Sequence, residues 1–219
     1  AAGWLGFTLS ATAETLWVIG KPDRDNREFA WAPNRFGELR HDGFFVVGHG
    51  RTEADWPYVH PGPADGWAGG KSHTFSVLFG LEALPAGGEC RLTLDTLDAH
   101  AGQPPEVRIS VNGRDFQKPL AKGAGDASIF GEPGKGRPEQ WSVTFPADLL
   151  RRGANEVAIT TLSGSWFLYD ALMLETPPGA RLGEVEGTVL SGIRSAPVLV
   201  ERNGRLSQTI ELTIRRVGG

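Results

Sequence analysis

The stretch that decides the fold is VTFPADLLRRGANEVAITTLSGSWFLYDALMLE, residues 143–175, taken with EVRISVNGRDF at residues 106–116. In EVRISV, apolar and polar residues alternate, which is typical of a strand with one buried face. The alternation stops at Asn112-Gly113, a dipeptide that tolerates positive φ angles and favours a tight turn. The segment therefore predicts a β-hairpin.

The longer stretch continues the same pattern. Residues 146–150, PADLL, predict one short helical turn that ends by Gly153, and residues 156–160 predict a further alternating strand. A last strand follows, with five apolar positions: Trp166, Leu168, Ala171, Leu172 and Leu174. Strands separated by short turns indicate an antiparallel sheet.

Composition supports an all-β fold. The 219 residues include 30 Gly, 15 Pro and 7 Trp, and they contain no long helical pattern. The length allows one substantial core, or one domain with a fragment of another. Further strands are predicted upstream, at residues 14–20, 44–47, 73–81 and 90–97. Gly and Pro concentrate at residues 48–71 and 118–138, which predicts two long loops.

Charge and cysteine content exclude several classes of function. The 22 basic and 26 acidic residues give a net charge of −4, and no basic run exceeds two residues, so we expect no nucleic-acid partner. No apolar run reaches the roughly 20 residues that span a membrane. The single cysteine, Cys90, excludes an internal disulfide, and its place in an alternating run predicts a buried core residue. The five histidines show no metal-ligand spacing.

The chain is expected to divide near Pro177-Pro178. Residues 1–176 would form the β-sandwich, and residues 177–219 would be a linker with extra strands. Two of these strands are joined by Asn203-Gly204, a favourable hairpin turn. Because two or three strands are not stable alone, they either extend the sandwich or open a following domain, and we favour the second.

The loop over residues 48–71 is the candidate binding site. Sugars pack their C–H faces on aromatic rings and hydrogen-bond to polar side chains, and this loop supplies both kinds of group. The candidate ligand-binding residues are Arg51, Asp55, Trp56, Tyr58, His60 and Trp67. The alternative is that Trp56 and Trp67 only pack the loop against the sandwich. Trp17 and Trp166, which lie inside alternating strands, are instead expected in the core.

Several motifs resemble one known family. They are LWVIGKPDR at residues 16–24, Glu28-Phe29, DWPY at residues 55–58 and YDALMLE at residues 169–175. Together they resemble the third, carbohydrate-binding-module-like domain of family 4 polysaccharide lyases, the rhamnogalacturonan lyases, over roughly residues 14–175. The resemblance implies an antiparallel β-sandwich of the jelly-roll, galactose-binding-like type with long irregular loops.

The resemblance also bears on metals. Asp170 matches a position that helps to bind structural calcium in some sugar-binding jelly rolls. The segment DRDNRE, residues 23–28, has alternate oxygen side chains, but its two arginines and its lack of glycine favour a solvated turn over a calcium loop. We therefore expect no cofactor, with structural calcium as the alternative.

The resemblance implies a non-catalytic, carbohydrate-binding accessory domain in a secreted or periplasmic enzyme that degrades a pectin-like polysaccharide. Its partners would be a polysaccharide or oligosaccharide and the neighbouring catalytic domain. One alternative is a polysaccharide lyase or glycoside hydrolase in its own right, which would use Arg51, Asp55, His60 or His73. The other is a purely structural domain that supports a catalytic neighbour.

Overall fold

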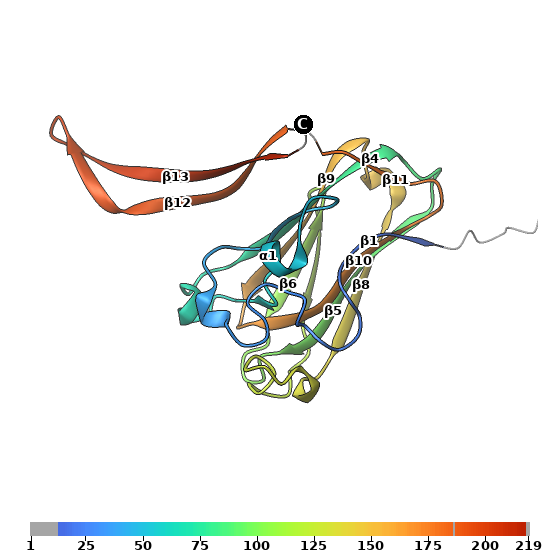
Figure 1. Ribbon diagram of the computed structural model, residues 1–219, viewed down its shortest axis with the longest axis horizontal. Helices are drawn as coiled ribbons and strands as arrows, with labels where there is room; N and C mark the ends of the chain where they lie inside the picture. Colours follow the sequence, from blue (N-terminus) through green and yellow to red (C-terminus); the bar gives the residue numbers. More distant parts are fainter. Residues whose placement is uncertain (1–12, 186, 218–219) are drawn as a thin grey trace, which may run out of the picture.

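The computed structural model describes residues 13–185 and 187–217, with the side chains of residues 189–197 and 215 left out. Two β-sheets pack face to face as a sandwich, and a long two-stranded hairpin projects from one end of it (Figure 1). The predicted all-β, antiparallel sandwich is thus confirmed. Among the described residues, no helix is both long and apolar enough to cross a membrane.

The first sheet has the strand order β1-β10-β5-β8, with β3 pairing with β10. Its strands are β1 (Glu14–Gly20), β3 (Val59–His60), β5 (Glu89–Ala99), β8 (Glu139–Pro146) and β10 (Phe167–Thr176). The pairs are antiparallel, and β10 lies at the centre between β1 and β5. A bulge in β10 interrupts the register between Tyr169 and Ala171.

The second sheet has the order β11-β4-β9-β6-β7, and β2 runs parallel beside β4. Its strands are β2 (Phe44–Val46), β4 (Thr74–Ala83), β6 (Glu106–Val111), β7 (Arg114–Pro119), β9 (Gly153–Ser163) and β11 (Arg181–Gly183). Since β11 pairs with β4, the second sheet extends past the predicted boundary at residue 176.

The helices are short, and all lie in the connections. They are η1 (Phe36–Glu38), α1 (Thr52–Asp55), η2 (Gly66–Ala68), η3 (Pro133–Lys135) and η4 (Ala147–Leu149). The predicted helical turn after Pro146 is η4. The predicted loop over residues 48–71 contains α1, β3 and η2, so it is more ordered than its Gly and Pro content indicates.

The Asn-Gly turn predicted between β6 and β7 is present. Asn112 and Gly113 both have positive φ angles, 48° and 88°. The Asn112 side chain also accepts a hydrogen bond from the backbone of Glu156 at 3.0 Å and donates one to the carbonyl of Leu149 at 2.8 Å. These bonds attach the hairpin to the start of β9.

The core lies between the two sheets and is filled by the alternating apolar positions. Phe75, Val77 and Phe79 of β4 face it, as do Leu92 and Leu94 of β5. Trp17 and Trp166 are buried in the same core, which confirms their predicted place. Cys90 is also buried, and burial raises the pKa of its thiol to about 11, so it is a packing residue.

The C-terminal strands β12 (Gly187–Arg202) and β13 (Arg205–Val217) form the projecting hairpin. Its turn is the predicted Asn203-Gly204, again with positive φ angles of 53° and 72°. Within residues 187–217, β12 pairs with β13 and with no further strand. The hairpin meets the sandwich at a small apolar joint, which consists of Val185 and Val217 packed on Phe44, Val46 and Leu78.

Candidate functional site

The predicted binding segment is divided between the surface and the core. Trp56, Tyr58 and His60 are each 0% exposed. Trp56 packs against Phe75 and Tyr169, with ring centroids 5.4 Å away in both cases. This is the packing role that the sequence left open for Trp56, and in this arrangement the ring has no face for a ligand.

His60 is held inside the sandwich by aromatic rings and hydrogen bonds. Its ring stacks on Phe75 at 3.9 Å and on Phe167 at 4.9 Å. Nε2 donates to the carbonyl of His73 at 3.1 Å, so Nδ1 accepts from the Tyr169 hydroxyl at 2.8 Å. Burial lowers the pKa of His60 to about 3, and the imidazole is therefore neutral at physiological pH.

The other residues considered for an enzyme do not complete a site with His60. His73 is buried, with Nδ1 2.5 Å from Asp42 and Nε2 3.0 Å from the carbonyl of Ala68. Asp55 accepts the backbone N–H of Arg51 at 2.9 Å on α1. Asp55 also lines a cavity of about 160 Å³ at the root of the hairpin, with Phe44, Val46, His49, Gly50, Arg216 and Val217.

Trp67 lies in a different environment, among aromatic residues from two other loops. Its ring contacts Phe36 of η1 edge-on at 5.0 Å, and Phe36 in turn contacts Phe130 at 5.5 Å. Trp67 and Phe36 are half-buried, and Phe130 is 59% exposed. We call these three residues, Trp67, Phe36 and Phe130, the aromatic row.

A buried carboxylate fixes Trp67. Oδ1 of Asp65 accepts the indole N–H of Trp67 at 3.2 Å and the hydroxyl of Ser165 at 2.5 Å. Oδ2 accepts the backbone N–H of Gly62 at 2.8 Å. Because three donors converge on one carboxylate, the polar edge of the indole is turned inwards.

Tyr58 lies beneath the loop that carries Phe130. Its hydroxyl donates to the carbonyl of Ile129 at 2.8 Å, immediately before Phe130. Burial raises the pKa of Tyr58. The buried Tyr58 side chain thus bonds to the backbone of this loop from below.

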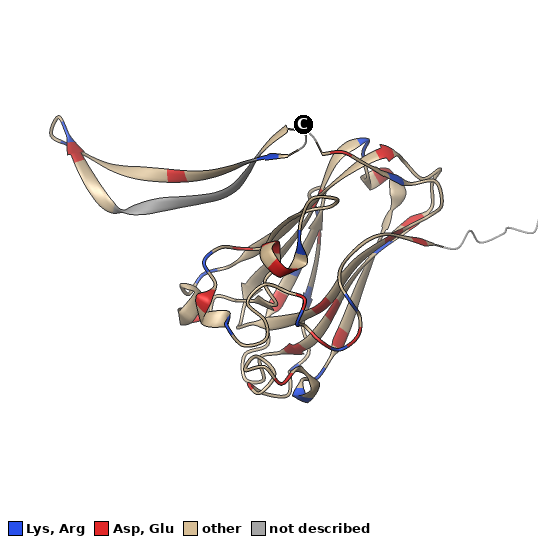
Figure 2. Cartoon of the chain, viewed as in Figure 1, with Lys and Arg blue, Asp and Glu red and all other residues tan. Residues whose placement is uncertain are grey.

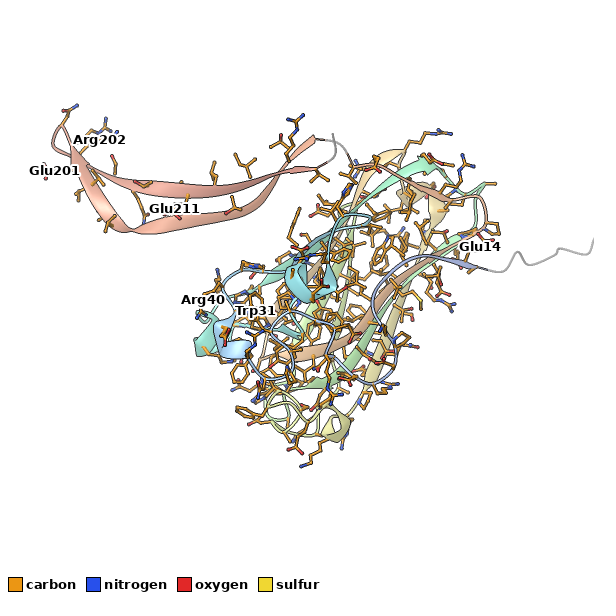
Figure 3. The ribbon with its side chains drawn as sticks, viewed as in Figure 1. Glu14, Trp31, Arg40, Glu201, Arg202 and Glu211 are labelled. Atoms are coloured by element: carbon orange, nitrogen blue, oxygen red, sulfur yellow. The ribbon has the colours of Figure 1, made fainter. Side chains whose placement is uncertain are left out.

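Trp31 extends the aromatic surface at this end of the sandwich. It is half-buried, and its ring lies 5.2 Å from that of the exposed His41. Its φ angle of 61° is rare for a bulky residue, and such strain is concentrated at functional sites. Arg40 lies at the same end (Figure 3), where its guanidinium donates to the carbonyls of Gly37 and Leu39.

Sequence reasoning did not find Trp31, Phe36 or Phe130 as site residues. They lie in loops over residues 30–42 and 120–138, far along the chain from Trp67. A local pattern cannot show that these loops meet. The concentration of aromatic and Gly or Pro residues in both loops was the signal that could have drawn attention to them.

Asp170 is the position that the resemblance connects with calcium. It sits in the β10 bulge, fully buried, and its Oδ1 accepts the backbone N–H of Arg24 at 3.0 Å. Burial raises the pKa of Asp170 to about 6; the Arg24 hydrogen bond opposes the shift and the charge of Asp95 adds to it. Oδ2 has no hydrogen-bond partner.

A cationic side chain lies beside these carboxylates. The guanidinium of Arg24 lies 3.5 Å from Asp95 and 3.9 Å from Oδ2 of Asp170. In the described part of the chain, no group of three or more His, Cys, Asp or Glu side chains could hold a metal ion. Two oxygens of the segment 23–28, Oδ1 of Asn26 and Oε1 of Glu28, are buried without a hydrogen-bond partner, and structural calcium stays a prediction.

The fold is a β-sandwich with long loops at one end, the fold class of carbohydrate-binding modules. A family model described as "CBM-like: Polysaccharide lyase family 4, domain III" matches residues 15–174. The chain belongs to this family, and it is thus a carbohydrate-binding-module-like accessory domain. No curated protein matches the sequence.

Solved structures of family 35 carbohydrate-binding modules are similar to the chain at low identity. The module from Cellvibrio japonicus Abf62 has 14% identity and a TM-score of 0.36, and the match covers 80% of this chain and 95% of that one. A module from an environmental isolate has 13% identity and a TM-score of 0.36, over 76% of this chain and 97% of that one.

Proposed function

We propose that the loop end of the sandwich, formed by the aromatic row and Trp31, binds a polysaccharide. The observation that carries the proposal is the exposed ring of Phe130, which continues a line of ring contacts to Phe36 and Trp67. Exposed aromatic surface of this kind suits the C–H face of a sugar. Family membership supports carbohydrate as the ligand class.

Polar groups beside the rings suit the hydroxyls of the same ligand. The exposed pair Arg35–Glu38, at 3.2 Å, flanks Phe36. The exposed pair Lys135–Glu132, at 2.6 Å, follows Phe130 in the chain. Both pairs offer charged donors and acceptors to a sugar hydroxyl, which contributes to specificity.

We further propose that the chain acts beside the catalytic domain of a secreted or periplasmic enzyme that degrades a rhamnogalacturonan-containing, pectin-like polysaccharide. Binding would raise the effective concentration of the catalytic domain on its substrate. This chain would then need no catalytic group of its own. The bonded, buried state of His60 and His73 agrees with that role.

Affinity electrophoresis in gels that contain rhamnogalacturonan tests the proposal. Phe130→Ala and Trp67→Ala should each weaken binding by about 1 to 3 kcal/mol, the size of one aromatic contact. Val18→Ala is the matched control for Phe130→Ala, because Val18 is 46% exposed on β1. It should leave both binding and stability unchanged.

Two results would contradict the proposal. One is retardation of the wild-type chain by the glycan that neither aromatic substitution alters, since the binding surface would then lie elsewhere. The other is a loss of melting temperature in Trp67→Ala without loss of affinity, which would leave Trp67 as a packing residue. Turnover of the polysaccharide by the isolated chain would favour the enzymatic alternative.

A further inference from the structure

We propose that Asp98 is a positioning residue for Phe130, and that its carboxylate closes the loop of residues 120–138 and fixes the turn that presents the Phe130 ring to a sugar. This inference rests on the proposed function of the loop end. Asp98 lies near the end of β5, beside the start of β8, and the loop joins β7 to β8 (Figure 1). Because Asp98 is fully buried, it acts on the glycan only through the loop.

The carboxylate of Asp98 accepts three hydrogen bonds from the loop. Oδ1 accepts the backbone N–H of Ala124 at 2.9 Å and that of Arg137 at 3.1 Å. Oδ2 accepts the hydroxyl of Ser128 at 2.6 Å. Hydrogen bonds to a carboxylate are stronger than bonds between neutral groups. One buried side chain on the sheet therefore bonds to both ends of the loop and to its middle.

Ser128 is the first residue of the turn that carries Phe130. Its carbonyl accepts the backbone N–H of Gly131 at 3.2 Å, which closes a four-residue turn over residues 128–131. Within this turn Ile129 is buried in the core, and the next residue, Phe130, is exposed. The bond from Ser128 to Asp98 thus fixes the start of the turn, and the turn directs the Phe130 ring outwards.

The two ends of the loop lie directly on the backbone of β5. A Cβ atom at Gly123 would overlap the carbonyl oxygen of Ala99, and a Cβ atom at Gly136 would overlap that of Leu97. Only glycine allows the chain to approach another backbone so closely. The approach brings both ends of the loop within hydrogen-bond distance of Asp98.

The turn has a second attachment at Ile129, and it does not replace the first. The Ile129 side chain packs in the core, and its carbonyl accepts the hydroxyl of Tyr58 at 2.8 Å. This attachment holds one residue, and a turn held at one residue can still rotate and move the Phe130 ring. Asp98 holds the chain on both sides of Ile129, so the two attachments together give the ring one position.

Two substitutions disturb the contact in different ways, and the chain offers a control for each. Asp98→Ala removes all three bonds, whereas Gly123→Ala pushes the loop away from β5 and keeps the carboxylate. Asp170→Ala is the control for the first, because Asp170 is equally buried on the adjacent strand β10 and bonds to Arg24. Gly134→Ala is the control for the second, because a Cβ atom there has no other atom within 4 Å.

Amide hydrogen exchange of the full chain tests the turn without a ligand. The amides of Gly131 and Glu132 bond to carbonyls within the loop and not to Asp98. In Asp98→Ala and Gly123→Ala they should exchange roughly tenfold faster or more, the effect of losing a hydrogen bond to a charged group. The controls should leave exchange there unchanged. Unchanged exchange in either folded variant would overturn the proposal, and Gly123→Ala decides alone if Asp98→Ala does not fold.

Affinity electrophoresis in rhamnogalacturonan gels tests whether Asp98 acts through Phe130. Asp98→Ala and Gly123→Ala should bind roughly threefold to tenfold more weakly than their controls, a part of the loss expected for Phe130→Ala. In a chain that already carries Phe130→Ala, neither substitution should weaken binding further.

Two binding results would overturn the proposal. One is wild-type affinity in both loop variants while Phe130→Ala loses affinity, since Asp98 would then be only structural. The other is an equal further loss in the presence of Phe130→Ala, since Asp98 would then act on another residue. If Phe130→Ala itself binds like the wild type, the proposed function fails, whereas faster exchange at Gly131 and Glu132 would still show that Asp98 fixes the turn.

Discussion

The sandwich and the projecting hairpin have the same alternating sequence pattern and opposite burial. In β4 and β9, the inward positions Phe75, Val77 and Ile159 are fully buried. In β13, Leu206, Ile210, Leu212 and Ile214 also lie on one face, which Gln208 interrupts, yet they are 54–71% exposed. Alternation thus specifies a strand with one apolar face, and only a second layer decides whether that face is covered.

Charge does not compensate for this exposure. The described charged side chains of the hairpin lie near its tip, at Glu201, Arg202 and Arg205, in the middle of β13, at Glu211 (Figure 3), and at its root, at Arg216. On the sandwich they are scattered over the loops and the strands (Figure 2). The apolar face of the hairpin therefore resembles a buried sheet face in its amino-acid composition. In the described part of the chain, however, these side chains are exposed and no second layer covers them.

Among substitutions in the two regions, Trp56→Ala in the sandwich is expected to cause the largest loss of stability. Trp56 is fully buried among rings, and its removal leaves a cavity in the core. The free energy of unfolding should fall by about 3 to 5 kcal/mol. Urea unfolding followed by far-UV circular dichroism measures the change.

Leu206→Ala on the hairpin is the control for that prediction. It should change the free energy of unfolding by less than about 0.5 kcal/mol, because the side chain is exposed. Equal losses for both variants would show that the hairpin face is covered in solution, and the contrast between the regions would disappear.

The second-largest effect is expected at Asp170, a buried carboxyl group of the sandwich that should make stability depend on pH. Because burial raises the pKa of Asp170 from 3.8 to about 6, the folded state binds a proton more tightly than the unfolded state. Its contribution to stability is therefore full below about pH 4 and is lost as the pH rises to about 6. We expect this contribution to reach about 3 kcal/mol.

Asp170→Asn isolates the contribution. Unfolding free energies are measured from pH 4 to pH 8 for both proteins, and the wild type should gain relative to the variant as the pH falls. A gap that stays constant with pH would contradict the raised pKa. Calcium that stabilises the wild type at pH 8, but not the variant, would support the calcium alternative for Asp170.

Local features of the fold could be predicted from the sequence, and long-range contacts could not. The turns at Asn112-Gly113 and Asn203-Gly204 depend on two adjacent residues that tolerate positive φ. The burial of Trp17 follows from its place in an alternating strand. Trp56 and Trp67, by contrast, occur in the same Gly- and Pro-rich segment, and nothing local shows that one is buried and the other half-exposed.

The candidate site illustrates the same limit. Trp67 was within the predicted segment, but its neighbours Phe36 and Phe130 reach it through tertiary contacts between three loops. Tyr58 was predicted to touch the ligand, whereas its side chain is buried and its hydroxyl donates to the carbonyl of Ile129 in one of those loops. Binding by Arg51, Asp55 and Trp67 remains a prediction.

A smaller effect is expected when the hairpin is removed. A chain that ends at residue 185 keeps β11 and loses Val217 from the apolar joint. The melting temperature should fall by only ~2 to 4 °C, which corresponds to about 1 kcal/mol. Ending the chain at residue 178 also deletes β11 and exposes the edge of β4, so a larger fall is expected. A fall of many degrees for the chain that ends at residue 185 would place the hairpin within the sandwich fold.

The smallest effect on stability is expected on the hairpin face itself. Ile210 is 61% exposed at the middle of β13, so Ile210→Ser should change the free energy of unfolding by less than about 0.5 kcal/mol. A contiguous exposed apolar face should nevertheless bind a hydrophobic dye such as ANS. The substitution should therefore lower ANS fluorescence without changing the melting curve. Thr209→Ser, on the opposite face of the same strand, is the control and should change neither. If Ile210→Ser instead destabilises the chain and leaves the ANS signal unaltered, the apolar face of β13 is packed against another surface in solution, and the two regions differ in their partners and not in their burial.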